Sequence, residues 1–285
     1  MEERSMWKTL TPEDLDKAYS PSSVAANYRE VVANYGESSH RTLARAKSLR
    51  LNYGETPDEY VILFESPGRV ADSLLVFFHG GYWQDLSAED SCFPADSLLS
   101  SGIAYAAVNY TLAPHASVGT IVAQSAKALK KLASSRPDTR IVIAGSSAGA
   151  HLAAMLISTD WQRCGLKTAP FHGAVLLSGV YDLRPLVTTY INEPLGLDIQ
   201  SATAVSPLFS TAYATVPTVV CWGEHETGEF KRQSREYASQ LTRAGASVSC
   251  YEVPGRNHFD ILFDLTDPAT RLGAETIELL LGEKS

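Results

Sequence analysis

The chain has 285 residues, of which 45% are hydrophobic and 20% are charged, and its formal net charge is −8. A chain of this length and composition is typical of one large globular domain that buries its core without disulfides. The acidic balance argues against a nucleic-acid-binding protein, because phosphate binding needs clustered Lys and Arg side chains.

Residues 1–47 are polar and predict a helical N-terminal extension. Thr11 precedes Pro12, which is the order of an N-cap residue and a proline at the first helical position. A second, longer helix is expected to begin near Ser22 and to continue through Val31 and Tyr35.

Beyond residue 49, short apolar runs alternate with helical patterns. The expected strands are 60–64, 74–78, 103–108, 141–144, 173–177, 218–222 and 248–253, and the expected helices are 88–100, 118–134, 148–159, 229–244 and 268–281. This alternation predicts an α/β fold with a mostly parallel sheet that helices cover on both faces. The runs 60–64 and 74–78 are joined through Pro67-Gly68 and are expected to form an antiparallel hairpin at a sheet edge.

The alternation of strands and helices is interrupted at about 180–215, a region that contains several Pro, Ser and Thr residues. We expect a small cap-like insertion there, over the carboxyl ends of the strands, where open α/β sheets bind ligands. The sequence shows no internal repeat and no interdomain linker, so residues 1–285 are expected to form one domain.

Residues 145–149 read Gly-Ser-Ser-Ala-Gly and lie between the predicted strand 141–144 and the predicted helix 148–159. A strand, a G-x-S-x-G turn and a helix in this order are typical of a nucleophile elbow. Such a turn raises the serine hydroxyl at the end of the sheet, at the positive end of a helix. Ser147 is therefore the predicted nucleophile.

A serine nucleophile needs a base and an acid that orients the base. His258 follows the last predicted strand, so it is the expected base. The acid should follow the strand 218–222, where Glu224, Glu226 and Glu229 compete. We favour Glu226, which lies between strand and helix, with Glu224 as the alternative; Glu229 suits the first turn of the helix. The order Ser147, Glu226, His258 is that of the α/β-hydrolase fold.

The oxyanion of acyl transfer needs two backbone N–H donors. Ala148 is expected to supply one, because it follows the nucleophile. The second is expected from the loop after the strand 74–78, which begins His79-Gly80-Gly81-Tyr82-Trp83. Gly81 is the preferred donor, Gly80 and Tyr82 stay open, and His79 is expected to brace the loop.

No metal or cofactor site is expected. The sequence has no H-E-x-x-H pattern and no glycine-rich phosphate loop, and its four cysteines are too scattered for a metal-binding pattern. No apolar run approaches the roughly 18 residues that a membrane span needs, and the N-terminus does not resemble a signal peptide. We expect a cytoplasmic protein whose partner is a small-molecule substrate. The oligomeric state cannot be read from the sequence, and a homodimer stays open.

Four blocks of the sequence together resemble the kynurenine formamidase (arylformamidase) branch of α/β hydrolases, which is related to the hormone-sensitive-lipase-type esterases. The blocks are His79–Gln84, Gly145–Ala153, Ser178–Leu186 and Glu229–Ser234. The resemblance implies hydrolysis of N-formylkynurenine without a cofactor, with Ser147, Glu226 and His258 as the triad. The chain departs from the animal members at the acid, where they usually have Asp and it has Glu226.

Aromatic side chains near the site would suit an aromatic substrate. The expected wall residues are Trp83, Tyr181 and Tyr190, with Tyr28 or Tyr35 folding over from the N-terminal helices, and Asn192 is a candidate for a polar contact. Hydrolysis of another amide or a carbamate, and a broad carboxylesterase activity, are the alternative functions. A non-catalytic binder on the same fold is a remote alternative, because the chain keeps the serine, the histidine and the glycines.

Overall fold

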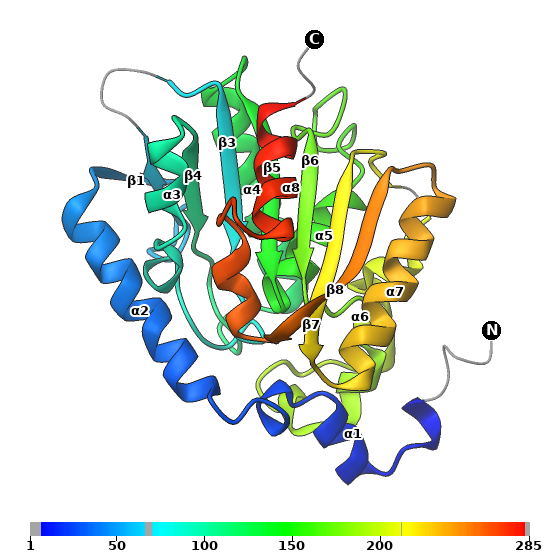
Figure 1. Cartoon of the computed structure of the whole chain (residues 1–285). Coiled ribbons are helices and arrows are strands. Elements are labelled where there is room, and N and C mark those ends of the chain that lie inside the picture. The colour runs from blue at the N-terminus through cyan, green and yellow to red at the C-terminus, as the bar shows by residue number, and fades with distance from the viewer. Residues whose placement is uncertain (1–6, 66–69, 212, 283–285) are drawn as a thin grey trace.

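The computed structural model describes residues 7–65, 70–211 and 213–282. These residues form an eight-stranded sheet in the order β1-β2-β4-β3-β5-β6-β7-β8 (Figure 1). The strands are β1 (Ser48–Asn52), β2 (Tyr60–Phe64), β3 (Ser73–Phe78), β4 (Ala104–Val108), β5 (Arg140–Ser146), β6 (Gly173–Leu177), β7 (Thr218–His225) and β8 (Val248–Asn257). From β4 to β8 all neighbours are parallel, which confirms the predicted α/β fold.

Helices cover both faces of the sheet and divide the core in two. The helices are α1 (Pro12–Ala18), α2 (Tyr28–Arg45), α3 (Ala95–Ser100), α4 (Val118–Ser135), α5 (Ala148–Ile157), α6 (Ile199–Ala204), α7 (Gly228–Arg243) and α8 (Arg271–Leu281). Residues of α4, α5 and α7 pack with Leu74, Val76 and Phe78 of β3. Residues of α2, α3 and α8 pack with the alternate residues Leu75 and Phe77. Because successive side chains of a strand point to opposite faces, each central strand needs apolar residues throughout.

The predicted pairing of 60–64 with 74–78 is wrong. β2 lies between β1 and β4 and is antiparallel to both, and β3 lies between β4 and β5. The edge hairpin is β1–β2, and β1 was missed because its mostly exposed residues lack an apolar run. Pro67-Gly68 lies outside the described residues.

The segment predicted as an insertion contains α6 and three short 3₁₀ helices, at Arg184–Thr188, Tyr190–Asn192 and Pro207–Phe209. It follows β6 at the carboxyl end of that strand. The N-terminal segment with α1 lies at the same end of the sheet, below β7 in the view (Figure 1). Among the described residues, no helix combines the length and the apolar character that crossing a membrane requires.

Candidate active site

Ser147 occupies a strained turn between β5 and α5. Its backbone has φ 57° and ψ −118°, a conformation that costs a non-glycine residue roughly 1–3 kcal/mol. The turn is closed by close backbone contacts: a Cβ at position 145 would lie 2.2 Å from the carbonyl oxygen of Gly149. A Cβ at position 149 would lie 1.9 Å from the carbonyl oxygen of Phe78. A side chain at either position would therefore collide with the backbone, at Gly145 with helix α5 and at Gly149 with strand β3, so both glycines of the motif are required.

His258 and Glu226 form a hydrogen-bonded pair. Nδ1 of His258, just after β8, lies 2.9 Å from Oε2 of Glu226, just after β7, and both side chains are buried. A carboxylate accepts, so the imidazole proton is on Nδ1 and Nε2 is left as an acceptor. The His258 ring packs against Phe230, with centroids 4.5 Å apart. This is the arrangement of a general base with an orienting acid.

The other two carboxylates of the acidic loop lie elsewhere. Oε2 of Glu224 accepts a hydrogen bond from Gly255 N–H at 2.8 Å. Glu229 lies in the first turn of α7, as expected, where it accepts from the Tyr19 hydroxyl at 2.7 Å and pairs with Arg232. The structure thus brings Glu226, and neither of its neighbours, to His258.

Ser178 supports the acid, a contact that the sequence analysis missed. Its hydroxyl donates to Oε1 of Glu226 at 2.6 Å, and Gly223 N–H donates to the same oxygen at 2.6 Å. Ser178 follows β6 directly, so its side chain lies at the same sheet edge as the pair. The position of Ser178 directly after a buried strand could have indicated this contact. In the sequence, however, Ser178 stood out only as the first residue of a block shared with the family.

Ser178→Ala should lower kcat by roughly tenfold to a hundredfold, because a hydrogen bond to a charged group contributes about 1.5–3 kcal/mol. The loss leaves Glu226 less firmly held against His258. Steady-state kinetics measure kcat, and a thermal melt checks that the fold persists. The matched control is Ser125→Ala, which removes a buried hydroxyl on α4 that bonds only to its own helix. Equal kcat values for the two variants would contradict a positioning role for Ser178.

The loop after β3 approaches Ser147 closely. A Cβ at position 80 would lie 3.3 Å from the Ser147 Cβ. Gly81 has φ 89°, and a Cβ there would lie 2.3 Å from the Asp85 carbonyl oxygen, so only glycine fits. Gly80, Gly81 and Tyr82 all line the cavity beside Ser147. Ala148 is the first residue of α5, so its N–H has no partner within the helix.

His79 braces this loop. Its ring stacks on Tyr110 with centroids 4.1 Å apart and planes 9° apart, and the Tyr110 hydroxyl donates to the His79 carbonyl at 2.8 Å. Burial lowers the pKa of His79 to about 4, so the ring is neutral. On α5, burial likewise lowers the pKa of His151, which bonds to the Val205 carbonyl at 2.7 Å, to about 4.

These two histidines make stability depend on pH. Their folded pKa values, about 4, lie below the 6.5 of a free imidazole, so the unfolded chain binds more protons between these values. Their contribution to the stability of the fold is complete above pH 6.5 and is lost as the pH falls from 6.5 toward 4. At pH 5 each should lower the free energy of unfolding by roughly 2 kcal/mol relative to pH 7.

Urea unfolding at pH 7 and pH 5 measures this difference. His151→Asn removes one of the two buried imidazoles. The decrease in the free energy of unfolding from pH 7 to pH 5 should therefore be smaller in this variant by roughly 2 kcal/mol, the contribution of one histidine. An equal fall in the variant and the parent chain would contradict the account.

A cavity of about 500 Å³ opens beside Ser147 and His258. Its aromatic lining comes from four parts of the chain: Tyr28, Tyr35, Phe77, Tyr82, Tyr190 and Phe259. Tyr190 was expected there, and Tyr28 and Tyr35 do fold over from the N-terminal segment. The cavity is of the size that small-molecule sites have.

The structure does not bring Trp83, Tyr181 and Asn192 to this cavity, and their expected role as substrate-binding residues is corrected. Trp83 is fully buried and packs edge-on against His151. Tyr181 is fully buried and stacks on Tyr237 with centroids 4.3 Å apart. The Asn192 amide bonds to the backbone of Val187 and Leu197. Each of these side chains makes its contacts inside the protein, and none lines the cavity.

The N-terminal segment is hydrogen-bonded to three parts of the site. The Tyr82 hydroxyl donates to the Tyr19 carbonyl at 2.6 Å, and the Asn257 amide donates to Asn27 at 2.9 Å. Tyr190 bonds to Ser20 at 2.8 Å, hydroxyl to hydroxyl. Residues 19–35 therefore form one wall of the cavity.

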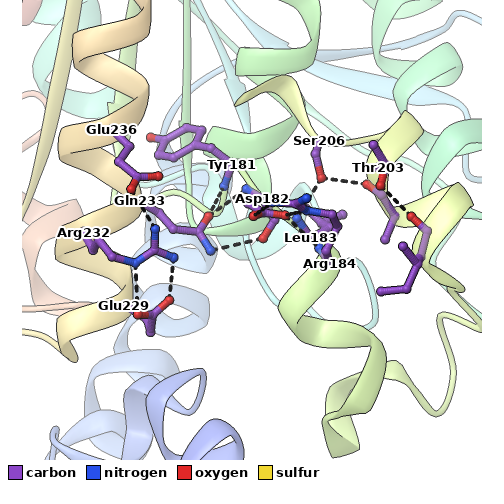
Figure 2. Close-up of polar contacts among 12 residues, drawn as sticks. Tyr181, Asp182, Leu183, Arg184, Thr203, Ser206, Glu229, Arg232, Gln233 and Glu236 are labelled. Carbon is purple, nitrogen blue, oxygen red and sulfur yellow. Dashed lines mark hydrogen bonds and ion pairs between the residues drawn. The ribbon is translucent and has the colours of Figure 1, made fainter. Parts of the chain in front are cut away.

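A buried polar network fixes the chain after β6 to α7 (Figure 2). The Gln233 amide oxygen accepts from Tyr181 N–H and Asp182 N–H, each at 2.7 Å. Its amide nitrogen donates to the Tyr19 hydroxyl at 2.8 Å. Arg232 lies between Glu229 and Glu236. The network joins three segments that surround the Glu226 loop.

Within the described parts of the chain, no group of three His, Cys, Asp or Glu side chains is arranged to hold a metal ion. Ser147, the His258–Glu226 pair and the N–H of Ala148 follow the carboxyl ends of the strands, and these are the kinds of group that acyl transfer by a serine needs.

Comparisons with known proteins place the chain among the α/β hydrolases. The alpha/beta hydrolase fold family matches residues 75–261. A kynurenine formamidase from Danio rerio is 33% identical over 92% of this chain and 94% of its own length. One from Drosophila melanogaster is 28% identical over 87% of this chain and 91% of its own. A crystal structure from Silicibacter sp. TM1040, with a provisional thioesterase assignment, has a TM-score of 0.78 at 29% identity, over 94% and 99% of the two chains.

Proposed function

Because the chain belongs to the kynurenine formamidase-like family of α/β hydrolases, we propose that it hydrolyses an aryl formamide of the N-formylkynurenine type to the free arylamine and formate. The observation that carries this proposal is that His258, which is paired with the buried Glu226, lines the same aromatic cavity as Ser147. An aromatic wall suits the aryl ring of such a substrate. The two relatives with this name match 92% and 87% of the chain.

In the proposed reaction, His258 Nε2 accepts the Ser147 proton as the hydroxyl oxygen attacks the formyl carbon. The N–H groups of Ala148 and Gly81 donate to the oxyanion that forms. The tetrahedral adduct then breaks its C–N bond, and His258 returns the proton to the departing arylamine. A formyl ester of Ser147 remains. His258 then takes a proton from water as the water oxygen attacks this ester. The ester C–O bond breaks, His258 returns the proton to the Ser147 oxygen, and formate is released.

Hydrolysis of short esters, or of another amide or carbamate, is a second candidate function. The cavity of about 500 Å³ supports it, since this volume also accommodates the acyl and alcohol parts of a short ester. The same serine, base and donors would serve, because both reactions pass through a tetrahedral oxyanion and an acyl-enzyme.

The two candidates differ in how the acyl group affects the rate. We expect kcat/KM for N-formylkynurenine to exceed that for N-acetylkynurenine by roughly 10–200-fold, the discrimination that one extra methyl group allows in a fitted pocket. The test compares these two amides with p-nitrophenyl acetate and p-nitrophenyl butyrate under the same conditions. Faster turnover of the acetyl amide, or hydrolysis of the esters with neither amide accepted, would overturn the formamidase in favour of the second candidate.

A further inference from the structure

Charged side chains are few in the cavity wall. Besides the imidazole of His258, the described lining residues include one arginine and one aspartate, Arg29 and Asp85. Most of the remaining lining is aromatic, aliphatic or hydroxyl-bearing. A single cation and a single anion in a largely apolar wall favour a ligand that carries one charge of each sign.

Arg29 enters the cavity from the histidine side. It lies in the first turn of α2, and its Nε donates to the Tyr28 hydroxyl at 3.0 Å. The Tyr28 ring in turn packs on Phe259, centroids 5.6 Å apart, and Phe259 is the neighbour of His258. None of the ion pairs among the described residues uses Arg29. Its guanidinium is thus held at the wall with its charge open to a ligand.

Asp85 enters from the oxyanion side. It ends the tight loop that begins at Gly81, and its N–H donates to the Gly81 carbonyl at 3.0 Å. Its Oδ1 accepts from Leu86 N–H at 2.8 Å, which fixes the carboxylate against its own loop. Its other carboxylate oxygen accepts no hydrogen bond from the described residues, so it can accept one from a ligand. The two charges therefore reach the cavity from different segments, Arg29 from helix α2 and Asp85 from the loop after β3.

We infer that Arg29 and Asp85 select substrates with a zwitterionic amino-acid end, Arg29 binding the carboxylate and Asp85 the ammonium group. A guanidinium offers a carboxylate two parallel N–H donors, and a carboxylate oxygen accepts from an ammonium group. This inference rests on the proposed function, since it concerns the part of the substrate remote from the formyl group. It assigns Arg29 and Asp85 as specificity residues of the same cavity.

The test compares two aryl formamides that differ only in that end. N-formylkynurenine carries the amino acid, and 2-formamidoacetophenone ends at the ketone methyl group. In Arg29→Gln and in Asp85→Asn, kcat/KM for N-formylkynurenine should fall roughly tenfold more than that for 2-formamidoacetophenone, the effect of one hydrogen bond to a charged group. Matched controls are Arg41→Gln and Glu30→Gln, which change exposed charges of the same helix that do not line the cavity.

Equal losses on the two formamides, or no loss on either, would overturn the inference. Failure of the proposed function gives a different result, because the unaltered chain would then hydrolyse neither formamide. In that event O-acetyltyrosine and phenyl acetate serve as the charged and neutral pair. The quantity compared is kcat/KM for O-acetyltyrosine divided by kcat/KM for phenyl acetate. If both variants lower this ratio, the charge selection is supported, and if neither variant changes it, the inference is contradicted.

Discussion

Ser147→Ala should lower kcat on N-formylkynurenine by roughly 10⁴–10⁶-fold, the loss seen when a serine nucleophile is removed from a triad. Alanine keeps the Cβ that the strained turn at φ 57° already accommodates, so the fold should persist. The backbone bond from residue 147 N–H to the Leu177 carbonyl, at 2.8 Å, also stays. Steady-state kinetics at high enzyme concentration measure the residual rate, and a thermal melt shows whether the structure is intact.

The control for this variant is Ser146→Ala. Ser146 is the last residue of β5 and the other serine of the motif. Ser146 also lines the cavity, but the strained backbone conformation is that of the next residue. Because Ser146 has no part in the proposed proton transfer, the variant should keep most of the activity. A Ser147→Ala protein that retains substantial turnover, or a larger loss in Ser146→Ala, would remove Ser147 from its proposed role.

Glu226→Gln should lower kcat by roughly 10⁴-fold, because the amide forces the wrong histidine tautomer. Oε1 of Glu226 accepts from both Ser178 and Gly223, so the glutamine oxygen must take this place. The amide NH₂ then faces His258 Nδ1, which can pair with it only as an acceptor. The imidazole proton moves to Nε2, and the nitrogen facing the cavity can no longer accept the serine proton.

The matched control is Glu224→Gln, since Glu224 is exposed and accepts a single bond from Gly255. Its kcat should stay close to that of the unaltered chain. Since both substitutions remove one negative charge from the same loop, their difference isolates the contact with His258. A larger loss in Glu224→Gln would move the acid to that residue.

The sheet, and the position of the candidate site at the carboxyl ends of its strands, were predictable because both depend on local sequence patterns. Buried parallel strands need continuous apolar runs, and the runs 141–144, 173–177 and 218–222 became β5, β6 and β7. In a parallel sheet the carboxyl ends of the strands meet at one edge. The order of Ser147, Glu226 and His258 along the chain therefore implied that their loops lie together before any distance was known.

The walls of the cavity were harder to predict, because an aromatic residue in a loop suits a core as well as a ligand. Trp83 and Tyr181 lie in the same blocks as the site yet turn inward onto His151 and Tyr237. Tyr28 and Tyr35, far away in sequence, reach the cavity instead. Their placement depends on long-range contacts such as that between Asn27 and Asn257, which no local pattern encodes.

The pairing of β2 was unpredictable for a related reason. A short connection between two apolar runs usually joins neighbouring strands. Here β4 lies between β2 and β3, and β2 pairs on its other side with the exposed strand β1. Because β1 has no apolar run, the sequence offered no competing partner for β2.

Covalent labelling of the nucleophile tests the central claim most directly. The protein would be treated with an alkyl fluorophosphonate, with and without N-formylkynurenine, and the modified peptide identified by mass spectrometry. We predict one label per chain, on Ser147, formed in step with the loss of formamidase activity and slowed by the substrate. A label on another residue, or activity that is lost while Ser147 stays unmodified, would contradict the proposal that a formyl group is transferred to Ser147 in this cavity.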